Sequence, residues 1–75
     1  MDQARYGVLL FQSTNWALKA EGAAKRAGFN IKLIPTPRQL SSDCGTALRF
    51  NWEEREPLLQ ALSDRGVSFE RMAEL

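Results

Sequence analysis

The residue best suited to chemistry in this chain is Cys44, its only cysteine. It lies in the segment 33–50, where Pro35, Pro37 and a run of small polar residues predict a shaped loop between two apolar stretches. A thiolate is a nucleophile, and one thiol is enough to accept and pass on a group by exchange. Self-contained disulfide chemistry would need a second cysteine. The chain also has no histidine to serve as a general base for hydrolysis or to help build a zinc site.

Polar neighbours of the cysteine could hold an anion beside it. Arg38 and Arg49 offer positive charges, and Ser41 and Ser42 offer hydroxyl donors. Gly45 frees the backbone so that successive amides could form a concave anion site. Asp43 acts in the opposite direction, because a nearby carboxylate disfavours the thiolate. The net shift of the thiol pKa therefore stays open.

A structural role for these residues is the alternative. Free cysteine is often a small buried hydrophobic residue. The Ser-Ser-Asp triplet also suits a turn or a helix cap. Arg38 and Arg49 would then be solvated or ion-paired side chains.

Size and charge exclude several classes of protein. The 75 residues allow one domain, 1–75, and a net charge of +1 gives no global attraction to nucleic acid or to an anionic membrane. The longest apolar run, Gly7–Phe11, is far shorter than the roughly 18 to 20 residues that cross a bilayer. A strand-like run directly after the first residues leaves no room for a signal peptide, and a lone thiol suits a reducing compartment. We therefore expect a cytoplasmic protein with no cofactor, no metal, no membrane contact and no nucleic acid partner.

The elements that must position the loop begin with a strand at Tyr6–Phe11. It is apolar on both faces, which predicts a central strand that is covered on both sides. A helix follows at Trp16–Ala27, where helix-forming residues dominate and no residue is β-branched. Its predicted apolar stripe runs from Trp16 through the alanines 20, 23 and 24 to Ala27, and Gly28 is its predicted stop. Ser13, Thr14 and Asn15 are its candidate N-cap residues.

Strand patterns, prolines and glycine stop signals predict the elements of the rest of the chain. The remaining predicted elements are strands at Phe29–Ile34, Thr46–Trp52 and Val67–Met72, and a helix that begins between Glu53 and Pro57 and ends at Gly66. Pro35 is expected to stop the second strand. The order βαββαβ predicts an α+β, ferredoxin-like domain with two helices on one face of a four-stranded antiparallel sheet.

This topology brings a second set of residues toward the cysteine. The first two strands run parallel, so the loops that follow them leave the sheet at the same end. The start of the first helix, with Ser13, Thr14 and Asn15, should therefore lie near Cys44. Free N–H groups between Ser13 and Ala17, together with the positive end of the helix dipole, would lower the pKa of the thiol.

The opposite face of the sheet suggests a second function. With both helices on one face, the other face needs a cover, which favours an interaction module that pairs with another protein or forms a homodimer through the open sheet face. Binding of RNA on this face is disfavoured, because the third strand lacks the aromatic run on which bases stack.

Four blocks of sequence support a resemblance to a known family. They are Tyr6-Gly-Val-Leu-Leu-Phe-Gln-Ser-Thr, Leu33-Ile-Pro-Thr-Pro-Arg, Leu40-Ser-Ser-Asp-Cys-Gly and Ala47-Leu-Arg-Phe50. Together they resemble the small bacterial domain family of selenium/sulfur carrier-like proteins, over nearly the whole chain. The resemblance implies that Cys44 is the persulfide or perselenide site and that the partners are sulfur or selenium donor and acceptor proteins.

Overall fold

The computed structural model describes residues 5–40 and 45–75 of the chain. In order, its elements are β1 (Tyr6–Leu10), α1 (Thr14–Arg26), β2 (Lys32–Pro35), β3 (Thr46–Asn51), the 3₁₀ turn η1 (Trp52–Glu54), α2 (Arg55–Asp64) and β4 (Arg71–Glu74). The predicted βαββαβ order is confirmed.

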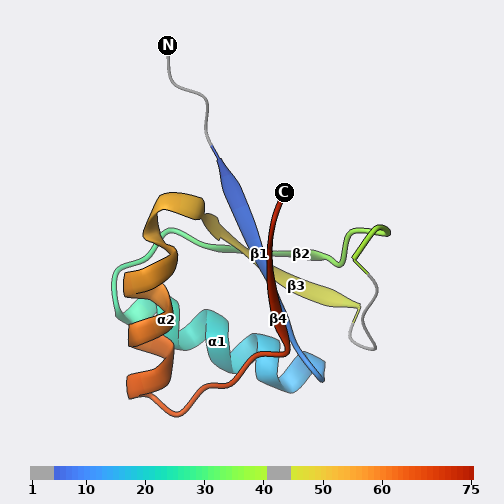
Figure 1. Cartoon of the computed structure of the whole chain (residues 1–75). Helices are drawn as coiled ribbons and strands as arrows, with labels where there is room; N and C mark the ends of the chain where they lie inside the picture. The colour runs from blue at the N-terminus through green and yellow to red at the C-terminus, as the bar shows by residue number, and fades with distance from the viewer. Residues whose placement is uncertain (1–4, 41–44) are drawn as a thin grey trace.

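The four strands form one sheet in the order β2-β3-β1-β4, in which every neighbouring pair is antiparallel (Figure 1). The strand β1 is central, as its two apolar faces predicted. Because β1 and β2 both run antiparallel to β3, they are parallel to each other. This is an α+β, ferredoxin-like arrangement.

Two hydrophobic clusters cover the two faces of the sheet. The larger lies between the sheet and both helices and contains Leu9, Phe11, Leu48, Phe50, Leu58, Leu62 and the alanines 17, 20, 23 and 24 of α1. The smaller lies on the opposite face and contains Val8, Leu10 and Ala47, with Ile34, Leu40 and Ala73 packed around them. Alanines along α1 let the helix approach the sheet closely. The predicted apolar stripe is confirmed at its centre, whereas Trp16 and Ala27 at its ends are only half-buried.

Both helices end at a glycine in the left-handed region. Gly28 has φ 89° and Gly66 has φ 70°, a conformation that side chains with a Cβ avoid. After α1, the N–H of Gly28 donates to Lys25 O at 3.0 Å and the N–H of Phe29 donates to Ala24 O at 3.0 Å. Gly66 and Val67 make the same pair of bonds to the end of α2. These are Schellman motifs, and they confirm the predicted stops.

Two predicted strands begin later than expected. The strand β2 begins at Lys32 because Phe29 is still bonded to α1, and Phe29 and Ile31 pack against the larger cluster instead. The strand β4 begins at Arg71, because the N–H of Val67 is used by the end of α2.

Two predicted strand ends also differ. Pro35 does not stop β2 but is its last residue, paired with Thr46, because β2 is an edge strand, where proline is tolerated. The strand β3 ends at Asn51, and Trp52 begins the 3₁₀ turn.

An exposed ion pair joins the start of β1 to the end of β4. Arg5 Nε and Nη2 each lie 2.8 Å from Glu74 Oε2. The hydrogen bond from Arg5, together with its charge, lowers the pKa of Glu74 below its ordinary value of 4.5. The pair therefore stabilises the fold fully above pH 4.5 and stops doing so as the pH falls through the lowered pKa.

We expect Glu74→Gln to lower the melting temperature slightly at about pH 7 and progressively less as the pH falls below 4.5 and through the lowered pKa of Glu74, because the carboxylate then becomes protonated in the folded chain as well. The effect is small because both side chains are largely in solvent. Thermal unfolding of the two proteins across this range measures it, and a difference that persists at the acid end would contradict the assignment.

Candidate functional site

The loop between β2 and β3 has a closed base. The N–H of Thr36 donates to Gly45 O at 3.0 Å, directly after the last strand pair, Pro35 with Thr46. The strands therefore fix both ends of the loop. Gly45, one of the predicted site residues, is exposed at this base.

A tight turn presents Arg38 to solvent. The N–H of Leu40 donates to Pro37 O at 2.9 Å, so Arg38 and Gln39 occupy the two central positions of the turn, and both are exposed. Leu40 then packs against the smaller hydrophobic cluster. This anchor ties the first half of the loop to the sheet face that carries no helix.

The predicted catalytic residue Cys44 and its neighbours Ser41, Ser42 and Asp43 lie outside the described residues. Their roles stay predictions. The described parts of the candidate site are Arg38, Gly45 and the start of α1.

The start of α1 is capped by a single side chain. Ser13 has extended backbone angles, φ −151° and ψ 162°, and its Oγ accepts a hydrogen bond from the N–H of Trp16 at 3.4 Å. Ser13 O also accepts from the N–H of Ala17 at 3.2 Å. Ser13 is thus the N-cap among the three predicted candidates. The N–H groups of Trp16 and Ala17, which the sequence predicted to be free, therefore donate hydrogen bonds within the chain.

Thr14 and Asn15 form the exposed first turn of α1, which contains no acidic residue. The positive end of the helix dipole is therefore not neutralised by a side chain of this turn.

The sheet register places the two halves of the candidate site at one end of the sheet. Leu10, at the end of β1, pairs with Ala47, and Ala47 pairs with Ile34 near the end of β2. The chain leaves β1 toward α1, and leaves β2 toward the Cys44 loop, at this same end (Figure 1). The predicted topology around the loop is thus confirmed, while the contact between Cys44 and α1 stays a prediction.

Arg49 is not part of this end of the sheet. Its guanidinium lies 4.4 Å from the centre of the Tyr6 ring, and Tyr6 begins β1 at the opposite end from the loop. The register pairs Arg49 with Val8 and with Lys32. The positive charge of Arg49, which the sequence made a candidate neighbour of Cys44, is therefore engaged with the Tyr6 ring. Arg38 is the cation that the loop itself presents.

A hollow beside the start of α1 was not foreseen from the sequence. It has a volume of about 540 Å³ and is lined by Ser13, Asn15, Trp16 and Lys19. The Lys19 ammonium lies 4.9 Å from the centre of the Trp16 ring, a cation–π contact. The spacing of three residues between Trp16 and Lys19 was the available signal, because it places both on one side of a helix.

The described ranges contain no cluster of three or more histidine, cysteine, aspartate and glutamate side chains that could hold a metal. Over the same ranges, none of the helices is both long and apolar enough to cross a membrane.

Comparison with protein families gives one match, and it covers almost the whole chain. The family described as "Putative Se/S carrier protein-like" matches residues 6–74, which include both halves of the candidate site. Comparisons with curated proteins and with solved structures gave no significant match. On the extent of the family match, the chain belongs to the Se/S carrier protein-like family.

Proposed function

We propose that this protein is a cytoplasmic carrier of sulfur or selenium and that Cys44 holds the carried atom. The observation that carries this proposal is the family match over residues 6–74. Two further features support it. Cys44 is the only thiol of the chain, and the loop that contains it leaves the sheet at the same end as the start of α1.

The proposed transfer is a thiol exchange. The Cys44 thiolate attacks the outer sulfur of a donor persulfide, a bond forms between Cys44 Sγ and that sulfur, and the sulfur–sulfur bond of the donor breaks to release the donor thiolate. The carrier is left with a persulfide, and no external oxidant or reductant is consumed. A perselenide donor would pass selenium in the same way. An acceptor thiolate then attacks the outer sulfur or selenium on Cys44, the bond from that atom to Cys44 Sγ breaks, and the Cys44 thiolate is released.

The groups around the cysteine have distinct proposed roles. Arg38 and the hydroxyls of Ser41 and Ser42 hold the negative outer chalcogen, and the backbone at Gly45 adds N–H donors. The start of α1, with Ser13, Thr14 and Asn15, adds the field of the helix dipole. Asp43 acts against these groups, because a carboxylate near Cys44 disfavours its thiolate.

The test is to incubate the protein with a cysteine desulfurase and free cysteine and to measure its intact mass. We expect the mass of one or more sulfur atoms to be added to the wild type and none to Cys44→Ser. Equal addition to both proteins, or addition to neither, would contradict the proposal. Reduction with dithiothreitol should restore the original mass, because it removes persulfide sulfur and leaves stable thiol modifications in place.

The rate of alkylation provides a second readout on the same residue. If the helix dipole and Arg38 act on Cys44, its apparent pKa should lie below the ordinary value of about 8.5. Iodoacetamide alkylation followed against pH gives this value. Arg38→Gln should move the apparent pKa upward, whereas Lys32→Gln, which removes a cation from an edge strand, should leave it unchanged.

A second candidate function is an interaction module that forms a homodimer through the open face of the sheet. It is favoured by one observation, that strands and the Pro37–Leu40 turn are the only described segments that contribute to the hydrophobic cluster on this face. Partners would then bind beside Leu40. Sedimentation velocity distinguishes a monomer from a homodimer, and a monomer at all concentrations would exclude the homodimer.

A further inference from the structure

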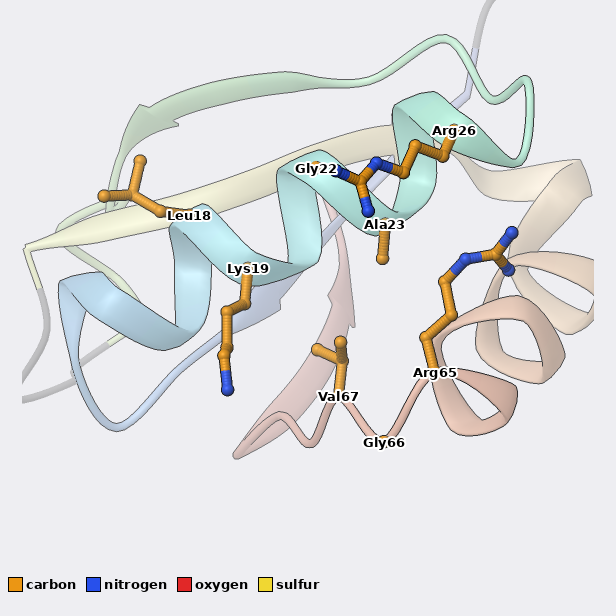
Figure 2. A pocket seen from close by; sticks show the side chains of 8 residues that line it. All are labelled: Leu18, Lys19, Gly22, Ala23, Arg26, Arg65, Gly66 and Val67. Atoms are coloured by element: carbon orange, nitrogen blue, oxygen red, sulfur yellow. The ribbon is translucent and has the colours of Figure 1, made fainter.

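A groove runs between α1 and the segment that joins α2 to β4. Its volume is about 510 Å³ (Figure 2). Apolar contacts are offered by Leu18, Ala23 and Val67, and Leu18 is 49% exposed. Gly22 opens the groove further, because a Cβ at this position would have no neighbour within 4 Å.

Three cations line this groove. They are Lys19 and Arg26 on α1 and Arg65 at the end of α2, and the groove has no acidic lining residue. Figure 2 shows Lys19 and Arg65 on either side of Val67 and the guanidinium of Arg26 folded back toward Gly22 and Ala23. The positive charges thus surround the apolar part of the groove.

None of the three cations forms an ion pair with another described residue. Arg5 pairs with Glu74 and Lys25 pairs with Glu21, both outside the groove. Lys19 contacts the Trp16 ring and Arg65 donates to the carbonyl oxygen of Ala61 at 3.4 Å, so neither charge is balanced by a carboxylate of the described residues. The chain has ten basic and nine acidic residues, so it contains enough carboxylates to pair with these cations. The groove is therefore a local basic site on a nearly neutral protein.

We propose that this groove, defined by Lys19, Arg26 and Arg65, docks an acidic segment of a partner protein. Lys19 and Arg26 are seven residues apart on one side of α1, which separates them by about 10 Å along the helix axis. A peptide with several carboxylates can place one opposite each of the three cations, whereas a small oxyanion offers a single centre of charge. Exposed apolar atoms between the cations fit the aliphatic parts of such a peptide. A nucleic acid fits less well, because the protein outside the groove is not basic.

The groove also leads toward the candidate site. Lys19 lines both the groove and the hollow formed by Ser13, Asn15 and Trp16 at the start of α1. A segment bound along α1 therefore reaches the end of the sheet from which the Cys44 loop emerges. The identity of the partner as a chalcogen donor or acceptor rests on the proposed function, but docking itself requires no thiol.

The experiment uses a fluorescein-labelled helical peptide whose glutamates are placed at positions i, i+4 and i+7, and a matched peptide with glutamine at these positions. Fluorescence anisotropy is recorded on the Cys44→Ser protein, so that binding and chalcogen loading are tested separately. We expect the glutamate peptide to bind at low salt and to dissociate as salt is added. Arg26→Glu and Arg65→Glu should each weaken binding about tenfold, because each replaces an attraction by a repulsion.

Two control variants make the result specific. Lys32→Glu makes the same charge change on the edge strand β2, away from the groove, and should leave the affinity within about twofold. Gly22→Gln fills the groove without changing charge and should weaken binding. Circular dichroism confirms that each variant is folded. Equal binding of the glutamine peptide, an equal effect of Lys32→Glu, or binding of inorganic sulfate with no binding of the peptide would overturn the proposal.

Discussion

Replacing Gly7 with alanine is expected to destabilise the protein by about 1–3 kcal/mol, the usual cost of overpacking a core. A Cβ on Gly7 would lie 2.5 Å from Trp52 Cε3 and 2.7 Å from Phe50 Cζ, distances that no packed carbon tolerates. One of the two rings would have to move. Urea unfolding followed by circular dichroism measures the loss.

Neither ring is free to move. Phe50 is 2% exposed and pairs across the sheet with Gly7, and its ring centre lies 6.2 Å from that of Trp52. Arg55 also holds the tryptophan, with its guanidinium 4.9 Å from the ring centre and its Nη1 donating to Trp52 O at 2.8 Å. The space above Gly7 is therefore fixed by the sheet and the 3₁₀ turn.

Gly22→Ala is the matched control for Gly7→Ala. The same chemical change in α1 meets no neighbour and should stabilise the protein by about 1 kcal/mol, because alanine favours a helix more than glycine does. The double variant Gly7→Ala/Trp52→Ala should lose less stability than the sum of the two single changes, since removing the ring makes room for the methyl group. Unchanged stability of Gly7→Ala would contradict the close approach.

The second large effect is expected for Phe50→Ala, which should destabilise the protein by about 3–5 kcal/mol. The ring is one of the two largest fully buried or nearly buried side chains in the described core, and its removal leaves a cavity between β3 and the helices. A domain of this size has a total stability of about 4–11 kcal/mol. The variant should therefore be unfolded in part already in dilute urea.

Phe69→Ala is the control for this change. Phe69 is 36% exposed and lies in the segment between α2 and β4. Its removal should cost less than about 1 kcal/mol, the range typical of surface substitutions. Both variants are compared with the wild type by urea unfolding. Similar losses for Phe50→Ala and Phe69→Ala would show that the core is not organised around the ring of Phe50.

The same variants also distinguish effects on stability from effects on the loading of sulfur on Cys44. Gly7 lies near the start of β1, at the opposite end of the sheet from the Cys44 loop. Loading of sulfur on Cys44 should therefore persist in Gly7→Ala at temperatures where the variant remains folded. Loss of loading in Cys44→Ser without loss of stability would then report on the thiol alone.

Features that depend on neighbouring residues were predictable from the sequence. A short run that is apolar on both faces identified the central strand β1. Gly28 and Gly66 marked the ends of both helices, because a left-handed residue at a helix end needs no distant partner. The element order then predicted the antiparallel sheet and the shared end of β1 and β2. This order was enough to bring Ser13–Asn15 and the Cys44 loop to one end of the sheet.

Features that join distant segments of the chain depend on how the elements pack. Pro35 belongs to β2 because that strand lies at the edge, and Gly7 is required because two rings from another strand and a turn pack over it. The position of Arg49 over Tyr6, rather than beside the loop, likewise depends on strand register. Sequence patterns report periodicity along one segment, whereas these contacts arise between segments that folding brings together.

The basic groove is the clearest case of this difference. Lys19, Arg26 and Arg65 are unremarkable charges along the chain, and the packing of α1 beside the end of α2 gathers them around Ala23 and Val67. For the Cys44 site, the sequence supplied the residue types and the topology supplied their common end of the sheet. In both cases local patterns fix the elements, and long-range packing decides which side chains share a surface.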